Sequence, residues 1–241
     1  MRMIEVLIIV CIILIICAIA IPGLLSSQRA SNERTASTAL KTLSSAEADF
    51  RSNDRDWNHV NDFWTGDVKG LYTMTSAGVR GAGTSEKDPA IKLIELETAA
   101  ADADPALYSA GGENMSLQAF AAPAPRKGYW FAALLTDLTL KDTEEATYKR
   151  DTGGTPSMGK CHNTSKFGFV AFPDSSSAGK YIFQVNENNT IFRWPVTGKP
   201  REGSNVPPGL DTIPGRYLTW PDDSELKTFW SELGSFSGKP D

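Results

Sequence analysis

Histidine and cysteine are scarce in this 241-residue chain, which has two histidines and three cysteines. Two of the cysteines, Cys11 and Cys17, lie in a long apolar run, and Cys161 stands alone in the rest of the chain. The chain after the apolar run therefore cannot form an internal disulfide, so packing and hydrogen bonds must stabilise its fold. His162 follows Cys161 directly, and adjacent side chains of a strand face opposite ways, which makes them a poor nucleophile–base pair.

The motifs of common enzymes are also missing from the sequence. It contains no nucleophile elbow, no phosphate-binding glycine loop and no paired zinc-ligand spacing, so we expect no enzymatic activity. Acidic residues outnumber basic ones by 29 to 24. Because surfaces that coat nucleic acids are normally basic, the bulk charge disfavours DNA or RNA as a partner.

The N-terminus, in contrast, contains one long run of apolar residues. Residues 3–25 read MIEVLIIVCIILIICAIAIPGLL, and about 20 apolar residues suffice for a helix to cross a bilayer. Glu5 interrupts this run, and a carboxylate is costly in hydrocarbon and usually marks a function. Pro22 removes a backbone donor from the expected helix, and Gly23 adds conformational freedom there.

The apolar run continues without a strong break into an amphipathic segment. Apolar side chains recur at three- and four-residue spacing, with Arg34, Lys41 and Glu47 between them: Ala36, Ala39, Leu40, Leu43, Ala46 and Phe50. The pattern predicts one continuous helix from residue 1 to about 51, roughly 75 Å long. Its second half should lay an apolar stripe against a sheet.

The segment IEVLIIVCIILIICAIAIPGLLSSQRASNERTASTALKTLSSAE resembles the N-terminal helix of type IV pilins and of type II secretion pseudopilins. Glu5 matches the glutamate at the fifth mature position, and Pro22 matches the proline near position 22. The chain departs from the family at Met1, where phenylalanine is usual, and at Arg2, where a small polar residue is common. The resemblance implies that Met1 is a methylated mature N-terminus and that a leader peptide has been removed. It covers roughly the first fifty residues, and the remainder has a looser similarity to large pilin-like proteins of bacteria such as planctomycetes.

The resemblance implies an α+β type IV pilin fold, with a long N-terminal helix packed on an antiparallel β-sheet head. Residues 1–28 would be the half that spans the membrane or forms the filament core, and 29–241 the amphipathic half plus the head. The implied function is a structural subunit of a type IV pilus or pilus-like surface filament, which is a helical homo-oligomer. The subunit would sit in the inner membrane until a prepilin peptidase, an assembly platform and an ATPase machinery place it in the extracellular filament. The alternatives are a major pseudopilin in a periplasmic type II secretion pseudopilus, and a membrane-anchored adhesin or lectin.

Four residues are the candidates for assembly: Glu5, Met1, Pro22 and Gly23. In a staggered assembly, Glu5 of one subunit would pair with the Met1 amine of its neighbour and fix the axial register. The alternative is that Glu5 reaches the headgroup region, about one turn from the helix end. At Pro22 and Gly23 the alternatives are a simple kink and a stretch that melts locally when helices pack.

An acidic stretch after the long helix is a candidate calcium loop. Its oxygens alternate as D-x-D-x-N-x-x-x-D, which resembles the loops of EF-hands; the predicted ligands are Asp54, Asp56, Asn58, the Val60 carbonyl, Asp62 and Asp67. The loop departs from that pattern because His59 replaces the turn glycine and Thr65 the final glutamate. The alternative is a solvated acidic turn. Possible Ca²⁺ is the only cofactor we expect, with no organic cofactor.

The rest of the chain predicts one α+β head. Residues 53–85 are rich in turn residues, and a helix is expected to begin near Ser85–Pro89 and to present Ile91, Leu93, Ile94 and Leu96. Four short aromatic-rich runs predict an antiparallel sheet: 128–135, 166–172, 180–186 and 190–194, with a hairpin at Asn188–Asn189. Asp222 and Glu225 have capping-box spacing before a final helix that reaches Leu233. The aromatic residues should form the core, and sequons at Asn114, Asn163 and Asn188 are weak candidates for glycosylation.

Overall fold

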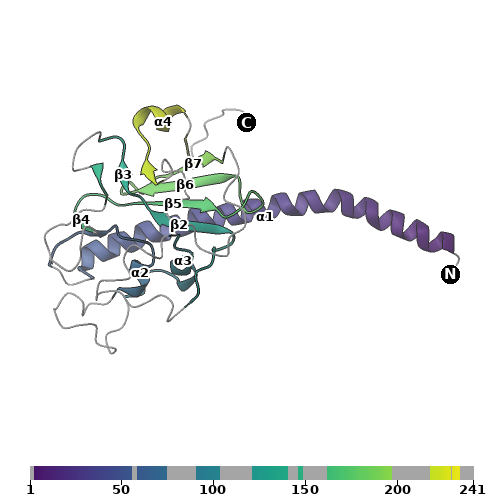
Figure 1. Ribbon diagram of the computed structural model, residues 1–241, viewed down its shortest axis with the longest axis horizontal. Helices are drawn as coiled ribbons and strands as arrows, with labels where there is room; N and C mark the ends of the chain where they lie inside the picture. The colour runs from purple at the N-terminus through teal and green to yellow at the C-terminus, as the bar shows by residue number, and fades with distance from the viewer. Residues whose placement is uncertain are drawn as a thin grey trace.

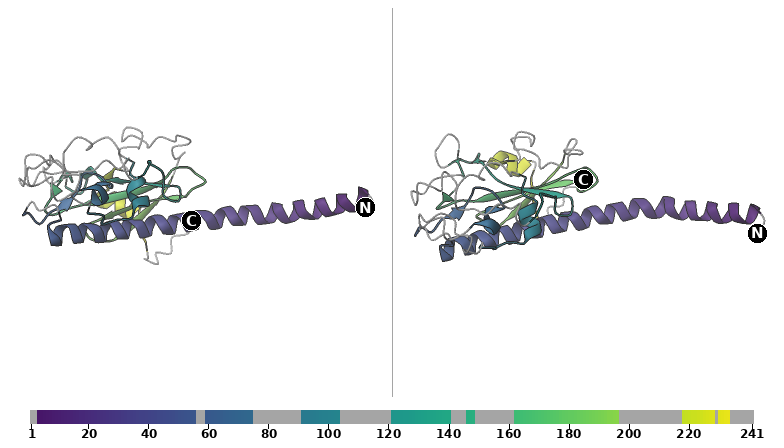
Figure 2. Two further views of the ribbon diagram at one scale, coloured as in Figure 1. Left: turned by 90° about the horizontal axis from the view of Figure 1, so that it is seen from below. Right: turned by 60° about the horizontal axis from the view of Figure 1, so that its bottom comes forward.

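A single long helix, α1, spans Met3–Asn53 and carries a β-sheet head on its second half (Figure 1). The computed structural model describes residues 3–55, 59–74, 91–103, 121–140, 146–148, 162–196, 218–228 and 230–233. The 51 residues of α1 make it about 76 Å long at 1.5 Å per residue. The first half extends well beyond the head, whereas the second half lies along one side of it (Figure 2). The predicted long helix is therefore confirmed.

The main sheet is antiparallel, with strand order β2-β5-β6-β7-β9. The strands are β2 (Tyr129–Ala133), β5 (Gly168–Pro173), β6 (Tyr181–Asn186), β7 (Ile191–Pro195) and β9 (Ser231–Glu232). The first four correspond to the four predicted runs. The predicted hairpin joins β6 to β7, and Asn189 adopts a φ of 57° at its turn, a left-handed conformation that asparagine tolerates better than most residues.

Both faces of this sheet are covered, so its strands read as continuous apolar runs rather than as alternating ones. The face toward α1 contains Tyr129, Phe131, Phe169, Phe183 and Val185, clustered with the apolar stripe of the helix. The opposite face forms a second cluster, which includes Trp130, Val170, Phe172, Ile182, Trp220 and Trp230. The molecule is thus layered as helix, sheet and C-terminal segments.

Short elements complete the head. Strand β1 (Phe63–Trp64) pairs with β4 (His162–Asn163), and β3 (Thr136–Asp137) runs parallel to β8 (Thr219–Trp220). The helices are α2 (Gly70–Thr73), α3 (Leu96–Ala100) and α4 (Asp223–Thr228). Strand β1 and helix α2 lie in a region that we expected to contain only loops and turns.

The helix expected from Ser85–Pro89 to about residue 100 is present only in its last part, and it is wrong for residues 91–95. Helix α3 begins only at Leu96, and residues 85–90 lie outside the described residues. Ile91 and Leu93 instead donate backbone hydrogen bonds to the carbonyls of Met74 (2.8 Å) and Leu71 (2.9 Å). A non-helical segment beside α2, in which Lys92 has a φ of 50°, therefore satisfies the donors that a helix would have used. It still packs these apolar side chains against the first core cluster.

The final helix starts as predicted but ends early. The Asp222 carboxylate accepts hydrogen bonds from the backbone of Ser224 (2.9 Å) and Glu225 (2.8 Å), so it acts as the N-cap. The helix ends at Thr228 instead of Leu233 because Ser231 and Glu232 form β9. There they pair with Arg193 and Phe192 and extend the sheet beyond β7.

Candidate functional site: the exposed half of α1 and its junction with the head

The first half of α1 is apolar on every side and is uncovered. Every residue from 3 to 28, the exposed half, is solvent-exposed. Sixteen large apolar side chains between Met3 and Leu25 are 46–91% exposed. Length and composition make α1 the one helix in the described part of the chain that could cross a membrane. A helix that is apolar all round needs an apolar environment all round, whether lipid or other helices.

The predicted assembly residues lie within or beside this exposed half. Glu5 is in the first turn of α1, and Met1 lies outside the described residues. The helix continues through Pro22, although proline cannot donate to the Ala18 carbonyl. A Cβ at Gly23 would meet nothing within 4 Å. Contacts within the described part of the chain therefore do not explain why glycine stands there.

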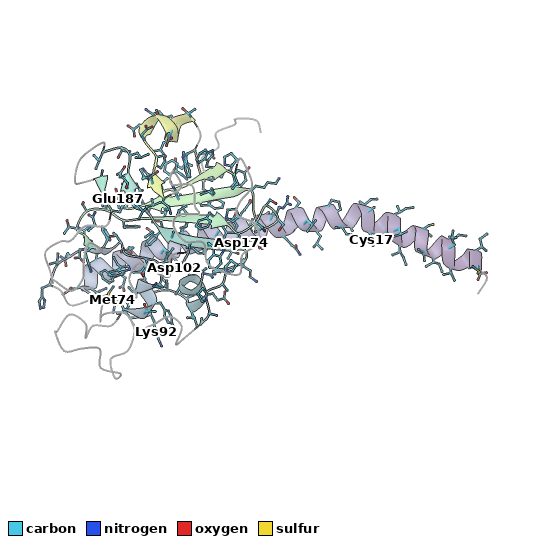
Figure 3. The ribbon with its side chains drawn as sticks, viewed as in Figure 1. Cys17, Met74, Lys92, Asp102, Asp174 and Glu187 are labelled. Atoms are coloured by element: carbon cyan, nitrogen blue, oxygen red, sulfur yellow. The ribbon has the colours of Figure 1, made fainter. Side chains whose placement is uncertain are left out.

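Cys11 and Cys17 are also on the exposed half, and both are free thiols. Figure 3 marks Cys17 on the part of α1 that extends beyond the head. Cys161, the third cysteine, lies outside the described residues. The expectation that the head lacks an internal disulfide therefore stays a prediction.

A loop between β5 and β6, residues 174–180, fastens α1 where it leaves the head. Arg29 Nε donates to the Ser177 carbonyl (3.3 Å), and Asn32 Nδ2 donates to the Ala178 carbonyl (3.0 Å). The backbone N–H of Lys180 donates to Glu33 Oε1 (2.8 Å). Figure 3 shows Asp174, at the start of this loop, beside the point where the helix emerges. These polar contacts begin directly after residue 28 and set the boundary between the exposed half and the head.

The predicted apolar stripe holds the second half of α1 against the sheet. All six of its predicted members are buried, and Leu40 and Leu43 are completely so. Arg34 and Lys41 are exposed, as residues between the stripe positions should be. Glu47, expected among them, is instead fully buried at 0% exposure. The signal was present in the spacing, because Glu47 follows Leu43 by four residues and precedes Phe50 by three.

Glu47 belongs to a buried polar cluster that links α1 to the β1–β4 ribbon, which is formed by strands β1 and β4. Glu47 Oε2 accepts a hydrogen bond from the backbone N–H of Trp64 (2.9 Å). Nearby, His162 Nδ1 lies 3.2 Å from Asp62 Oδ2, and both side chains are at most 3% exposed. The His162 ring packs edge-on against Trp64, with ring centroids 5.2 Å apart. Burial raises the pKa of Glu47 well above its ordinary value, and the neighbouring Asp62 charge raises it further.

A second polar group, Asp67 and Asp102, contacts Trp64 and the backbone that leads into α2. Asp67 Oδ1 accepts from the Trp64 indole nitrogen (3.1 Å) and from the Gly70 backbone (2.7 Å). Asp102, marked in Figure 3, accepts from the backbone N–H groups of Val68 and Lys69 at 3.0 and 2.9 Å. These carboxylates satisfy the backbone donors of the turn that leads into α2, so their contacts are structural.

The predicted calcium ligands have protein contacts wherever the structure describes them. Asp54 accepts from the His59 backbone at 3.1 and 3.2 Å, and the Val60 carbonyl accepts from the Asp62 backbone at 3.0 Å. Asp62 and Asp67 point into the head and are each 1% exposed. Asp56 and Asn58 lie outside the described residues. Among the described side chains, no group of three or more His, Cys, Asp or Glu is placed to hold a metal ion. Calcium binding stays a prediction.

The three sequons differ in accessibility. Asn114 lies outside the described residues, and Asn188 is exposed at the β6–β7 turn. Asn163 is 1% exposed, and its Nδ2 donates to the Tyr148 carbonyl (3.1 Å). Its Oδ1 accepts from the backbone of Ser165 (2.9 Å) and Lys166 (3.0 Å). Glycosylation at Asn163 is therefore incompatible with the folded head.

A cavity of about 380 Å³ opens on the sheet face opposite α1. Phe192 and Trp220 form an aromatic wall, with ring centroids 5.6 Å apart in an edge-on arrangement. Glu187, which Figure 3 marks at the end of the head farther from the exposed half, also lines it. Burial raises the pKa of the Glu187 carboxyl. The sequence gives no sign of this cavity, because its lining residues come from segments far apart in the chain.

The aromatic residues predicted to form the core do so wherever they are described. Eight are buried: Phe63, Trp64, Trp130, Phe131, Phe167, Phe169, Phe172 and Phe183. Phe192 and Trp194 are partly buried against the second cluster, and Trp57 lies outside the described residues.

No protein-family model, curated protein or solved structure matches the chain.

Proposed function

We propose that the chain is a structural subunit of a type IV pilus or a pilus-like surface filament, with a pilin-type head on a helix that forms the filament core. Before assembly the exposed half would anchor the subunit in the inner membrane. A prepilin peptidase, an assembly platform and an ATPase machinery would be its partners. The extended helix and antiparallel head are compatible with this assignment.

The single observation that carries the proposal is the uncovered apolar half of α1. Sixteen exposed large apolar side chains in one rod represent on the order of 20 kcal/mol of gross stabilisation once they are buried, at ~1.5 kcal/mol or more each. A bilayer supplies that environment to a single subunit, and neighbouring helices supply it in a filament. Transfer between these two surroundings needs little net change in apolar burial, which makes extraction from the membrane feasible for a machine.

Glu5 supplies the specificity that apolar packing lacks. Sixteen similar aliphatic side chains tolerate several axial offsets, whereas a carboxylate paired with the Met1 amine of a neighbour defines one offset. A slipped subunit would leave two charges in an apolar core, and unpaired buried charges are strongly destabilising. The pairing would therefore select the register of the helical assembly.

Replacing Glu5 tests the proposal. Glu5→Val should leave membrane insertion intact, because the segment becomes more apolar, while the yield of filaments seen by electron microscopy falls sharply. Cys17→Val is the matched control on the same exposed half, and it should assemble like wild type. Wild-type filament yield with Glu5→Val would refute the pairing. Short periplasmic assemblies in place of surface filaments would favour the pseudopilin alternative.

The cavity on the outer face of the head favours a second candidate function, which is adhesion. Its volume of about 380 Å³ lies within the range of small-molecule sites, about 300–1,000 Å³. An aromatic wall beside carboxylate and amide groups suits a sugar, as in a membrane-anchored lectin. The two functions are compatible, because a face opposite α1 stays open when α1 packs into a filament core.

A further inference from the structure

Glu47 is a fully buried carboxylate, and no basic side chain among the described residues forms an ion pair with it. Its Oε2 accepts the Trp64 backbone N–H at 2.9 Å. Its Oε1 is buried, and no donor among the described residues lies within hydrogen-bond distance of it. A carboxylate ion in such a place loses its hydration free energy without gaining a counter-charge, whereas a neutral carboxylic acid loses far less hydration free energy on burial.

The charged groups around Glu47 give it no compensation. On α1 itself, Arg51 is exposed and its guanidinium lies over the Phe63 ring, 4.8 Å from the centroid. From the segment before β1, Asp62 adds a second negative charge, and β4 contributes His162, whose Nδ1 faces Asp62. From the turn before α2, Lys69 Nζ lies 3.6 Å from Asp67 Oδ2. Strands β5 and β6 present apolar side chains to this part of α1.

We propose that Glu47 is a proton-binding latch: the head takes up one proton at this side chain when it folds, and its hold on the last turns of α1 weakens when that proton is lost. The latch acts on the β1–β4 ribbon, because the bond from Trp64 to Glu47 joins β1 directly to the helix. The inference concerns the head alone and does not depend on the proposed filament.

The sign of the pH dependence follows from the direction of the pKa shift. Folding raises the pKa of Glu47 above its ordinary value of 4.5, so the folded state binds the proton more tightly than the unfolded chain. The stability linked to this group is fully present below pH 4.5 and is lost as the pH rises through the higher folded pKa. The head should therefore be more stable at pH 5 than at pH 8.

Thermal unfolding of the full chain in detergent micelles tests the latch. All six tryptophans lie outside residues 1–28, so their fluorescence reports the head. The wild-type melting temperature should fall by about 3 °C or more between pH 5 and pH 8, as expected for a loss near 1 kcal/mol in a chain of this size. Glu47→Gln keeps an acceptor for Trp64 and has no proton to lose. It should show a markedly flatter profile and should melt at or above the wild-type temperature at pH 8.

Two further variants make the result decisive. Glu47→Ala should share the flatter profile but melt lower at every pH, because the Trp64 N–H is left buried without an acceptor. Glu97→Gln is the matched control, since the Glu97 side chain is 77% exposed, and it should keep the wild-type slope. All profiles are recorded with calcium and with chelator, because Asp62 is also a candidate calcium ligand, and the slopes should agree. Equal slopes for wild type and Glu47→Gln would overturn the proposal, even if the variant were less stable at every pH.

Discussion

Two alanine substitutions on the same helix should have opposite effects, because the two halves of α1 have different surroundings. Leu43 is completely buried against the sheet. Leu43→Ala should therefore cost about 2–5 kcal/mol of head stability. At about 2–4 °C per kcal/mol for a chain of this size, the melting temperature should fall by about 4–20 °C. Ile15 is 62% exposed, and Ile15→Ala should leave the melting temperature of the head unchanged.

The order of the two variants should reverse when filament assembly is measured. Ile15→Ala removes about 2 kcal/mol of apolar burial from each subunit when the exposed half packs against its neighbours. Its filament yield by electron microscopy should drop, whereas Leu43→Ala should assemble at temperatures where its head stays folded. The assays are tryptophan fluorescence on micelle-bound protein and filament counting on cells. A fall in head melting for Ile15→Ala, or none for Leu43→Ala, would refute the division of α1 into an exposed and a packed half.

Two further predictions concern ligands of the head. If the Asp54–Asp67 loop binds calcium, a chelator should lower the melting temperature of the head, and Asp56→Ala should abolish that response. Calcium at about a hundredfold excess over Kd would add ~2.7 kcal/mol to the stability of the folded head. A wild-type melting curve that does not move with chelator would identify an acidic turn. If the cavity beside Phe192 binds a sugar, wild-type protein should bind glycans on an array and Phe192→Ala should lose that binding. Ile15→Ala should bind as wild type, and equal binding by Phe192→Ala would exclude the cavity.

The sequence predicted the elements whose residues follow a strong local pattern. Helix α1 has the apolar run and then the stripe at three- and four-residue spacing, and both recur in the structure. The four main strands were recognisable because each is a short aromatic-rich run between turn residues. In these segments local preference and tertiary packing favour the same conformation.

The elements that the sequence did not predict depend on partners far away in the chain. Residues 91–93 are not helical because the carbonyls of Leu71, Tyr72 and Met74 accept their backbone hydrogen bonds. The final helix stops at Thr228 because β9 adds to the edge of β7. A periodic pattern favours a helix in both places, and only the location of the acceptors decides against it. Long-range pairing of this kind leaves no mark in a local pattern.

The exposure of the acidic residues of the head could not be predicted from the sequence either. Asp62 and Asp67 look like solvated ligands in an acidic stretch, yet both are 1% exposed and contact protein groups. Their partners are His162, a hundred residues away, and the Trp64 indole and Gly70 backbone close by. A carboxylate that satisfies buried donors resists withdrawal to bind a cation, because each donor would then be left unsatisfied inside the head. Calcium binding through Asp67 would therefore leave the Trp64 indole and the Gly70 backbone N–H without their carboxylate acceptor.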